Sequence, residues 1–420
     1  MLGLAIGDAL GAPVEGLKTG HIKQLYGDVD GFVDPEVAWA KKPHRWRMKA
    51  LYTDDTQQAL ALADSLLRCR GFSADHFKSV LVKMAEADTG AHFGAHRGTG
   101  KNFRASVRAA MDGKDETGQP SAGIGAMMRV APVGLFFADD EEELADAAIE
   151  QALVTHRDPR PLVMAAATAW AVARSATGDW DKAKPEEKLE ALVEFAGRME
   201  KRVESDFIHR LPVAGMDRMG LAGEGLSFFP RLLDLPDRNM VWKQIVSEAN
   251  RQFPSHKITE PGQGFVMAGG LSALFIALTS TDYADGVKKA VMLGKDTDTM
   301  AAIVGAVLGA RHGEEGIPGK WIKELINAEQ VALRGEALCS GTEEGLGVKD
   351  VVEMEAELTR KEEDARADLL ARMIKKGEAP LPPAKKKEKK KAEKQKEIPS
   401  ARDRKKKKQK PKREKAPWKK

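Results

Sequence analysis

Residues 297–312, TDTMAAIVGAVLGARH, consist almost only of Ala, Ile, Val, Leu and Gly after a short polar start. A helix that is apolar on nearly every side has to be buried. The segment is also too short to cross a membrane, which takes about 20 apolar residues. The rest of the chain must therefore surround it. An aromatic content of only 6%, with abundant Ala and Gly, favours close-packed helices over a β-sandwich.

Apolar residues recur at helical spacing along much of the chain, and no alternating pattern of useful length indicates a strand. We therefore predict an all-α, compact multi-helix fold. Residues 18–52 and most of 88–128 are expected to be loops, and 318–338 to close the globule. Helices are expected at 1–17, 52–71, 73–87, 101–112, 140–154, 159–177, 186–205, 239–251, 264–279, 282–292 and 297–312.

Three glycines in the first expected helix, Gly3, Gly7 and Gly11, recur at a spacing of four. Residues four apart lie on one face of a helix. A face without side chains allows another backbone to approach closely. We expect this helix to pack tightly against another one.

The C-terminal part of the chain differs in composition from the rest. Residues 347–377 predict a highly charged amphipathic helix that projects or packs weakly. Residues 384–420 hold 20 Lys and Arg against 5 Asp and Glu, although the whole chain has a net charge of only +4. A segment so polar cannot bury enough apolar surface to fold alone. We therefore divide the chain into a domain at 1–346, the charged helix at 347–377 and a disordered Lys-rich tail at 378–420.

The tail has two interpretations. Lys-rich segments bind nucleic acids and other polyanions without sequence preference. The tail is equally well explained as a solvated extension. The two cysteines, Cys69 and Cys339, are far apart, which argues against a disulfide framework and fits a reducing cytoplasm. No long apolar run predicts a membrane span.

Two short acidic motifs, TDDT at 53–56 and DTDT at 296–299, each begin an expected helix. Asp and Thr are good N-caps, so either motif alone is explained by capping. Together they supply four carboxylates. If the two helix starts meet, these charges repel one another unless cations neutralise them. Oxygen ligands favour Mg²⁺ or Mn²⁺, and the absence of a Cys/His cluster argues against zinc.

Five segments carry a family resemblance, from residue 2 to about residue 335. In this order they resemble motifs of the ADP-ribosylglycohydrolase family, which includes dinitrogenase-reductase-activating glycohydrolases and ADP-ribosyl-acceptor hydrolases. The resemblance implies an all-α fold with a binuclear Mg²⁺ or Mn²⁺ centre in a central cleft. It also implies hydrolysis of the bond between ribose C1″ of ADP-ribose and an acceptor on a protein or a small conjugate. The segments are GLAIGDALGAPVEGL (3–17), YTDDTQQAL (52–60), SAGIGAMMRVAPVGL (121–135), THRDPR (155–160) and GKDTDTMAAIVGAVLGA (294–310).

The resemblance also implies roles for individual residues. Glu15, with Asp55, would be catalytic, and a carboxylate there can orient or deprotonate a water. Phe265 would either stack on adenine or belong to the core. The implied metal ligands are Thr53, Asp54, Asp55, Asp296, Asp298 and Thr299, and the implied substrate contacts are Gly123, Gly125, Arg129 and His156.

Two residues depart from the family pattern. Ile124 stands where many members have Asn, and Lys295 replaces a Gly before the acidic motif. Because every implied ligand is present, a hydrolase is our leading hypothesis. The alternatives are a non-catalytic member that binds ADP-ribose or a nucleotide, and a nucleic-acid-binding protein that uses the tail.

Overall fold

A computed structural model of the chain describes residues 1–39, 42–253 and 257–376. By their internal contacts, Met1–Arg372 form one compact unit, and Met373–Lys420 are assigned to a second. Within the described residues the fold is all-α, as predicted, and extended pairing is limited to three isolated β-bridges. The Lys-rich tail lies outside the described residues, and the division of the chain at 346 and 377 stays a prediction.

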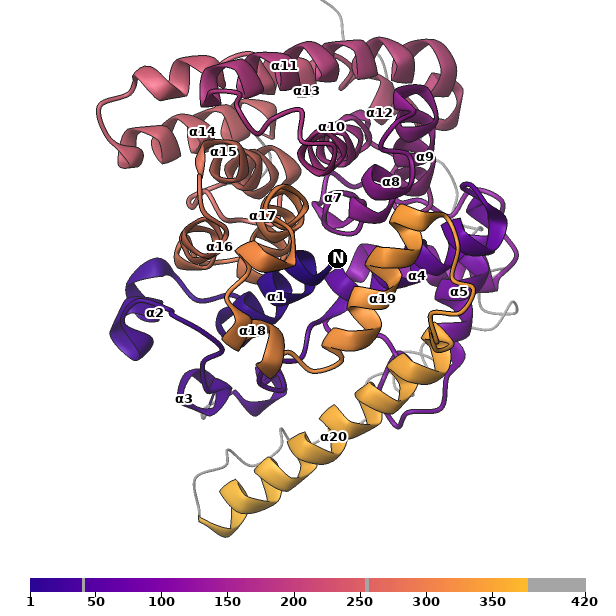
Figure 1. Cartoon of the computed structure of the whole chain (residues 1–420), viewed down its shortest axis with the longest axis vertical. Coiled ribbons are helices and arrows are strands. Elements are labelled where there is room, and N and C mark those ends of the chain that lie inside the picture. Colours follow the sequence, from indigo (N-terminus) through magenta and orange to yellow (C-terminus); the bar gives the residue numbers. More distant parts are fainter. Residues whose placement is uncertain (40–41, 254–256, 377–420) are drawn as a thin grey trace, which may run out of the picture. The chain divides into compact units, whose positions relative to one another are not determined.

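The helices are named in chain order and labelled in Figure 1. Their bounds are α1 (Leu2–Gly11), α2 (Thr19–Tyr26), α3 (Pro35–Trp39), α4 (Asp54–Cys69), α5 (Ala74–Glu86), α6 (Lys101–Met111), α7 (Gly125–Met128), α8 (Ala131–Phe136), α9 (Glu141–Leu153), α10 (Pro159–Ala176), α11 (Pro185–Arg202), α12 (Val213–Met216), α13 (Leu221–Leu226), α14 (Arg238–Gln252), α15 (Leu271–Thr279), α16 (Tyr283–Met292), α17 (Thr297–His312), α18 (Gly319–Glu324), α19 (Ala328–Ser340) and α20 (Val351–Lys375).

Helix α17 is the central helix of the first unit. It is buried from Thr297 to Leu308 and packs against α1, α10, α15 and α16. In Figure 1, α1 lies beside α17, and their contact is the most extensive between any two helices described. The expectation that the apolar segment is enclosed by other helices is confirmed.

The glycines of α1 explain how closely these two helices approach. A Cβ atom added to Gly3 would lie 2.2 Å from the carbonyl oxygen of Gly305, and one added to Gly7 would lie 2.0 Å from that of Ala301. At Gly11 the added atom would lie 2.4 Å from the backbone nitrogen of Asp298. The predicted close approach is therefore confirmed, and it extends to the acidic start of α17.

The loop expected at 18–52 was predicted wrongly in part, because α2 and α3 lie within it. Both are short, and α2 buries only Ile22, so neither has an apolar stripe that sequence periodicity can detect. The helix expected at 264–279 begins instead with a π-helical turn, Val266–Gly270, before α15.

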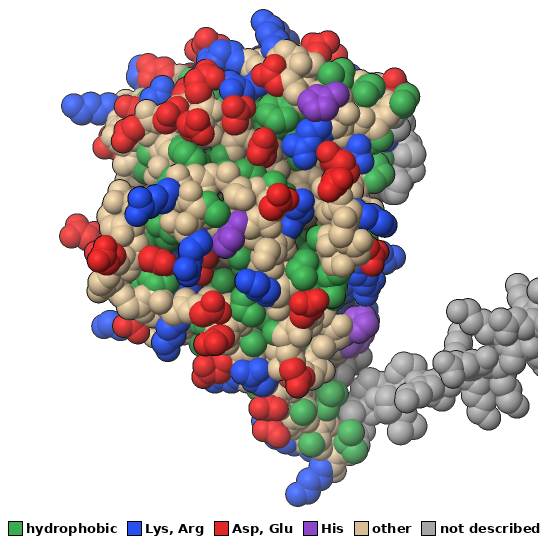
Figure 2. Space-filling view, turned by 90° about the vertical axis from the view of Figure 1, so that its right-hand side faces the viewer, with side chains coloured by type: hydrophobic (Ala, Val, Ile, Leu, Met, Phe, Trp, Pro, Cys, Tyr) green, Lys and Arg blue, Asp and Glu red, His purple; other side chains and the backbone are tan. Residues whose placement is uncertain are grey.

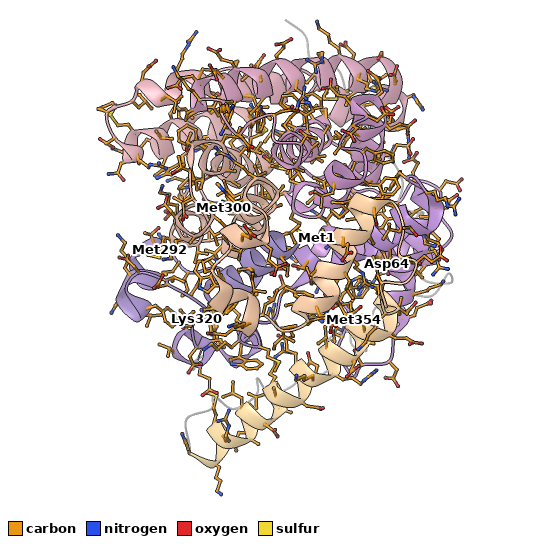
Figure 3. All side chains as sticks on the ribbon, viewed as in Figure 1. Met1, Asp64, Met292, Met300, Lys320 and Met354 are labelled. Atoms are coloured by element: carbon orange, nitrogen blue, oxygen red, sulfur yellow. The ribbon has the colours of Figure 1, made fainter. Side chains whose placement is uncertain are left out.

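The prediction that the charged C-terminal helix projects or packs weakly was wrong. Within the first unit, α20 buries Glu355, Thr359 and Glu362. Met354, labelled in Figure 3, is also buried, and its sulfur lies 3.3 Å from the side-chain amide of Asn327. The helix therefore packs through polar side chains as well as apolar ones such as Val351 and Leu369, and a search for an apolar stripe does not detect the polar part.

Figure 2 shows acidic and basic side chains interspersed over the face that it presents. Cys69 and Cys339 are both free and exposed, so they form no disulfide with each other. None of the helices in the described ranges is long and apolar enough to span a membrane.

Candidate active site

A cavity of about 440 Å³ lies where the two acidic helix starts meet. Its walls come from the loop after α1, the starts of α4, α6 and α17, and the segments around 121–129 and 155–156. Every residue predicted to be in the site lines this cavity except Thr53. Segments nearly 300 residues apart in the sequence thus converge on one cleft.

Asp8 of α1 caps α4. Its carboxylate accepts hydrogen bonds from the backbone N–H of Thr53 at 2.9 Å and of Thr56 at 3.0 Å. It also accepts from the hydroxyls of Thr53 at 2.8 Å and of Thr56 at 2.6 Å. A carboxylate from another helix therefore satisfies the amides that an N-cap side chain normally satisfies.

This arrangement weakens the explanation of TDDT as a simple cap, because the side chains of Asp54 and Asp55 are not needed for that task. Both line the cavity, and Asp54 Oδ2 accepts from Gln58 Nε2 at 2.9 Å. The hydroxyl of Thr53 donates to Asp8 at 2.8 Å and lies 3.3 Å from Asp55 Oδ2, and Thr53 itself does not line the cavity. Its role as a metal ligand therefore stays a prediction that this geometry does not favour.

The start of α17 is anchored by hydrogen bonds to backbone carbonyl oxygens of two other segments. The hydroxyl of Thr297 donates to the carbonyl oxygen of Gly11 at 2.8 Å, and Asp296 N–H donates to that of Gly262 at 2.9 Å. Asp296 is the N-cap residue but makes no side-chain capping bond. Asp296, Asp298 and Asp54 line the same cavity. The carboxylate of Asp296 is thus not used for capping and is available to a ligand in the cavity.

Glu15 is held beside these residues by the loop that precedes α17. Gly16 N–H donates to the carbonyl oxygen of Lys295 at 2.6 Å, and Lys295 N–H donates to that of Leu17 at 2.7 Å. Lys295 adopts a φ of 73°, a left-handed conformation that glycine adopts more readily. Its side chain does not line the cavity.

The carboxylates of the cleft perturb one another. Burial and the negative charge of Asp8 raise the pKa of Asp54 to about 8. Burial and the charge of Glu15 raise the pKa of Asp296 to about 6. The pKa values of the other two aspartates of these helix starts are raised well above the usual range, by burial first and by neighbouring carboxylates second. The predicted concentration of carboxyl groups is therefore present, and their negative charges are disfavoured in the absence of cations.

Divalent cations fit the chemistry of this cluster. Asp55 Oδ1 is buried and has no hydrogen-bond partner among the described residues, so its lone pairs are free to coordinate a cation. Carboxylate and hydroxyl oxygens are the donors that hard divalent cations prefer. In the described part of the chain, no three Asp, Glu, His or Cys side chains are already arranged to hold a metal ion. Binding an ion therefore requires these carboxylates to turn towards it.

The opposite wall combines two glycines with a histidine. A Cβ added to Gly125 would lie 3.3 Å from His156 Cε1, and one added to Gly123 would lie 3.5 Å from His156 Nε2. His156 Nδ1 lies 2.8 Å from the hydroxyl of Thr155, which accepts a hydrogen bond from Arg129. Donation of the Thr155 hydroxyl proton to Nδ1 would place the ring proton of His156 on Nε2, beside the two glycines.

Burial lowers the pKa of His156 to about 3, so the ring is neutral at ordinary pH. A neutral ring with its proton on Nε2 presents one hydrogen-bond donor towards the cleft. Oxygen atoms of a phosphate or a ribose would accept such a bond.

Arg129 lines the cavity, but its side chain is fully buried and hydrogen-bonded within the protein, so its direct contact with substrate stays a prediction. Its guanidinium donates to the side chains of Gln58 at 2.8 Å, Thr155 at 2.8 Å and Gln151 at 2.7 Å. Through Gln58 it orients the amide that donates to Asp54. Through Thr155 it fixes the ring of His156. Arg129 thus positions residues on both walls.

Phe265 is a core aromatic. Its ring stacks on Phe253 with centroids 5.0 Å apart, and the guanidinium of Arg160 lies 5.2 Å from its centre. It does not line the cavity, whereas Ile124 does. The stacking role considered for Phe265 is therefore not supported.

Sequence analysis missed Asp8 and Gln58 as site residues. A single carboxylate in the apolar helix GLAIGDALG is a signal for Asp8, because a buried charge requires partners. Gln58 lies four residues after Asp54, the spacing at which side chains on a helix meet.

The chain is similar to several known proteins in sequence and in fold. A family profile described as ADP-ribosylglycohydrolase matches residues 1–347. An uncharacterized protein of Archaeoglobus fulgidus is 27% identical over 334 residues, which cover 78% of this chain and 91% of that protein. The ADP-ribosylarginine hydrolase Tri1 of Serratia proteamaculans is 22% identical over 344 residues, which cover 80% and 77%. A solved structure described as an ADP-ribosylglycohydrolase-related protein complex has a TM-score of 0.54 and 27% identity, covering 81% of this chain and 95% of its own.

Proposed function

The chain belongs to the ADP-ribosylglycohydrolase family, and we propose that it hydrolyses the bond between ribose C1″ of ADP-ribose and a protein side chain, using two divalent cations. The observation that carries the proposal is the meeting of two acidic helix starts in one cleft, where Asp55 Oδ1 is buried without a partner in the described part of the chain. Capping does not explain these carboxylates, since Asp8 caps α4.

The residues that would hold the cations are Asp54 and Asp55 on one helix start and Asp296, Asp298 and Thr299 on the other. When bound, Mg²⁺ or Mn²⁺ would polarise ribose oxygens and lower the pKa of a coordinated water. These residues donate only oxygen atoms, which favours hard ions but gives no preference between Mg²⁺ and Mn²⁺.

The chain's own residues would orient the substrate. Glu15, at the edge of the carboxylate cluster, can accept a proton from the attacking water. The His156 Nε2–H group and the side-chain-free wall at Gly123 and Gly125 would receive the diphosphate. In this orientation the ribose of ADP-ribose would lie against the cations, and its diphosphate would lie against Gly123 and Gly125.

Release of ADP-ribose from modified peptides tests the proposal. The full chain would be incubated with arginine-linked and serine-linked ADP-ribosyl peptides, with Mg²⁺, with Mn²⁺ or with a chelator. Arginine-linked substrate deserves the first trial, because Tri1 is named an ADP-ribosylarginine hydrolase. We expect ion-dependent release, reduced at least about 100-fold in Asp298→Asn.

Asp217→Asn is the matched control, because Asp217 is exposed and does not line the cavity. It should leave release unchanged. Binding of ADP-ribose without turnover of either peptide would contradict the hydrolase and favour the non-catalytic alternative.

A further inference from the structure

Helix α20 lies beyond the family match, which ends at residue 347, yet it is built into the first unit through buried polar groups. Glu355 is 0% exposed, Thr359 is 1% exposed and Glu362 is 3% exposed. A carboxylate buried so completely requires charged or hydrogen-bonded partners. The partners of Glu355 all come from segments that surround the start of α4.

Among the described residues, the carboxylate of Glu355 receives three donors. Tyr52 donates its hydroxyl proton to Oε1 at 2.6 Å, and Gln57 Nε2 donates to Oε2 at 2.7 Å. A guanidinium nitrogen of Arg97 forms an ion pair with Oε2 at 2.9 Å, and both side chains of this pair are almost fully buried. One side chain of α20 thus joins three points on the globule.

These three points enclose the acidic motif. Tyr52 directly precedes Thr53, and its carbonyl oxygen accepts from Arg97 Nε at 3.3 Å. Gln57 directly follows Thr56, and its Oε1 accepts from the backbone N–H of Arg97 at 2.8 Å. The residues on both sides of TDDT are therefore tied to the same ion pair. The glycine after Arg97 lies close to Asp54, since a Cβ added to Gly98 would lie 2.8 Å from Asp54 Oδ1.

Other bonds of α20 fix the approach to the motif. Glu362 accepts from the backbone N–H of Met48 at 3.0 Å, and Thr359 donates to the carbonyl oxygen of Ala95 at 2.6 Å. Val351, Met354 and Ala356 of α20 are buried as well, and apolar packing attaches a helix at least as well as a buried ion pair, because desolvation offsets much of the attraction in the pair. Hydrogen bonds are directional and apolar contacts are not, so the bonds to α20 restrict the orientation of the backbone at 52–57.

We propose that α20 is part of the active-site scaffold and that Glu355 is a positioning residue, which holds the start of α4 so that Asp54 and Asp55 face the cations. The inference rests on the proposed function for the identity of the bound ions. The backbone constraint itself is independent of that function.

The test compares Glu355→Gln in the full chain with Glu357→Gln, a control that removes one charge from an exposed position of the same helix. Amide hydrogen exchange would be followed in peptides covering 52–58 and, for reference, 296–302. Mn²⁺ affinity would be measured by titration without substrate. For Glu355→Gln we expect about 10-fold faster exchange at 52–58, little change at 296–302, and about 10-fold weaker Mn²⁺ binding. In ADP-ribose release, kcat should fall and KM should change little.

The proposal would be overturned if folded Glu355→Gln had the wild-type exchange rate at 52–58 and the wild-type Mn²⁺ affinity. It would also be overturned if Glu357→Gln showed the same faster exchange and the same weaker Mn²⁺ binding as Glu355→Gln. If Glu355→Gln does not fold, Tyr52→Phe decides instead. This variant removes one donor to Glu355 and keeps the ion pair, so the same changes should appear at smaller size, and their absence overturns the proposal. If the wild type binds Mn²⁺ but releases no ADP-ribose, the proposed function fails, while exchange and Mn²⁺ affinity still decide the role of Glu355.

Discussion

The two acidic helix starts that share the cleft are held in different ways. The start of α17 is held by close backbone packing, where the glycines of α1 allow contacts that no side chain would permit. The start of α4 is held by buried polar groups, with Asp8 on one side and the Arg97–Glu355 pair on the other. We call the first the glycine support (Gly3, Gly7 and Gly11) and the second the polar support (Asp8, Arg97 and Glu355). Close packing is sensitive to added volume, whereas a polar network is sensitive to the loss of a charge, so different substitutions should disrupt the two supports.

The largest effect is expected at the glycine support. In Gly7→Val, the Cβ atom alone would lie 2.0 Å from the carbonyl oxygen of Ala301, so α1 and α17 have to separate. We expect a loss of at least about 5 kcal/mol in the free energy of unfolding, measured by denaturant titration. The control is Gly197→Ala in α11, where an added Cβ meets no atom within 4 Å. It should change stability by less than about 1 kcal/mol, and equal losses in both variants would refute close packing as the cause.

The sequence predicted the glycine support and not the polar one, for a physical reason. Small residues at a spacing of four indicate a close helix contact whatever the partner is. The contacts of Glu355 depend on residues about 300 positions away, such as Tyr52 and Gln57, and Glu is rarely buried. A charged amphipathic helix was therefore expected at the right place with the wrong packing.

The second effect is expected at the polar support. Arg97→Met leaves the buried carboxylate of Glu355 without its cation, which should cost about 3 kcal/mol in unfolding free energy. Combining it with Glu355→Met removes both charges and should recover more than half of that loss. Chemical denaturation of the two single variants and the double variant measures the coupling. Simple addition of the two single losses would show that the charges do not interact.

The candidate site shows the same limits of prediction. The acidic pairs and the glycine wall were recognised because their chemistry lies in local motifs. The roles of Asp8 and Arg129 depend on which distant groups their side chains reach. The capping by Asp8 joins α1 to α4, and Arg129 acts through Gln58 and Thr155. Such roles depend on contacts between distant segments, so they can be identified only from the folded structure.

Acid should weaken the polar support through His96, which precedes Arg97. Burial lowers the pKa of His96 from 6.5 to about 4. Between these values the unfolded chain binds a proton that the folded chain does not, so stability is complete above pH 6.5 and falls towards pH 4. This group should account for a loss of about 3 kcal/mol. His96→Gln should flatten the pH dependence of the unfolding free energy, and His92→Gln, at an exposed position, should not. If the unfolding free energies of the wild type and His96→Gln changed in parallel with pH, the proposed role of His96 would be contradicted.

The smallest effect concerns the loop before α17. Lys295 has a φ of 73°, which disfavours a side chain, so Lys295→Gly should raise the free energy of unfolding by up to about 1 kcal/mol. Gly294→Ala should lower it, because its φ is 78° and the new Cβ would lie 2.8 Å from the carbonyl oxygen of Leu17. Thermal unfolding compares the two. A stabilised Gly294→Ala would show that this loop is not as tight as described.

The central claim is that the two helix starts form one cation site, and thermal unfolding of wild type and Asp298→Asn, with chelator and with Mn²⁺, tests it most directly. The folded-state pKa of Asp298 is raised by burial and by neighbouring carboxylates, so without ions this group destabilises the folded chain near neutral pH. We predict that with chelator Asp298→Asn unfolds at a higher temperature than the wild type. Mn²⁺ at about 100 times its dissociation constant should stabilise the wild type by about 2.7 kcal/mol and the variant far less. A wild type indifferent to Mn²⁺, or a variant less stable than the wild type in chelator, would contradict the account.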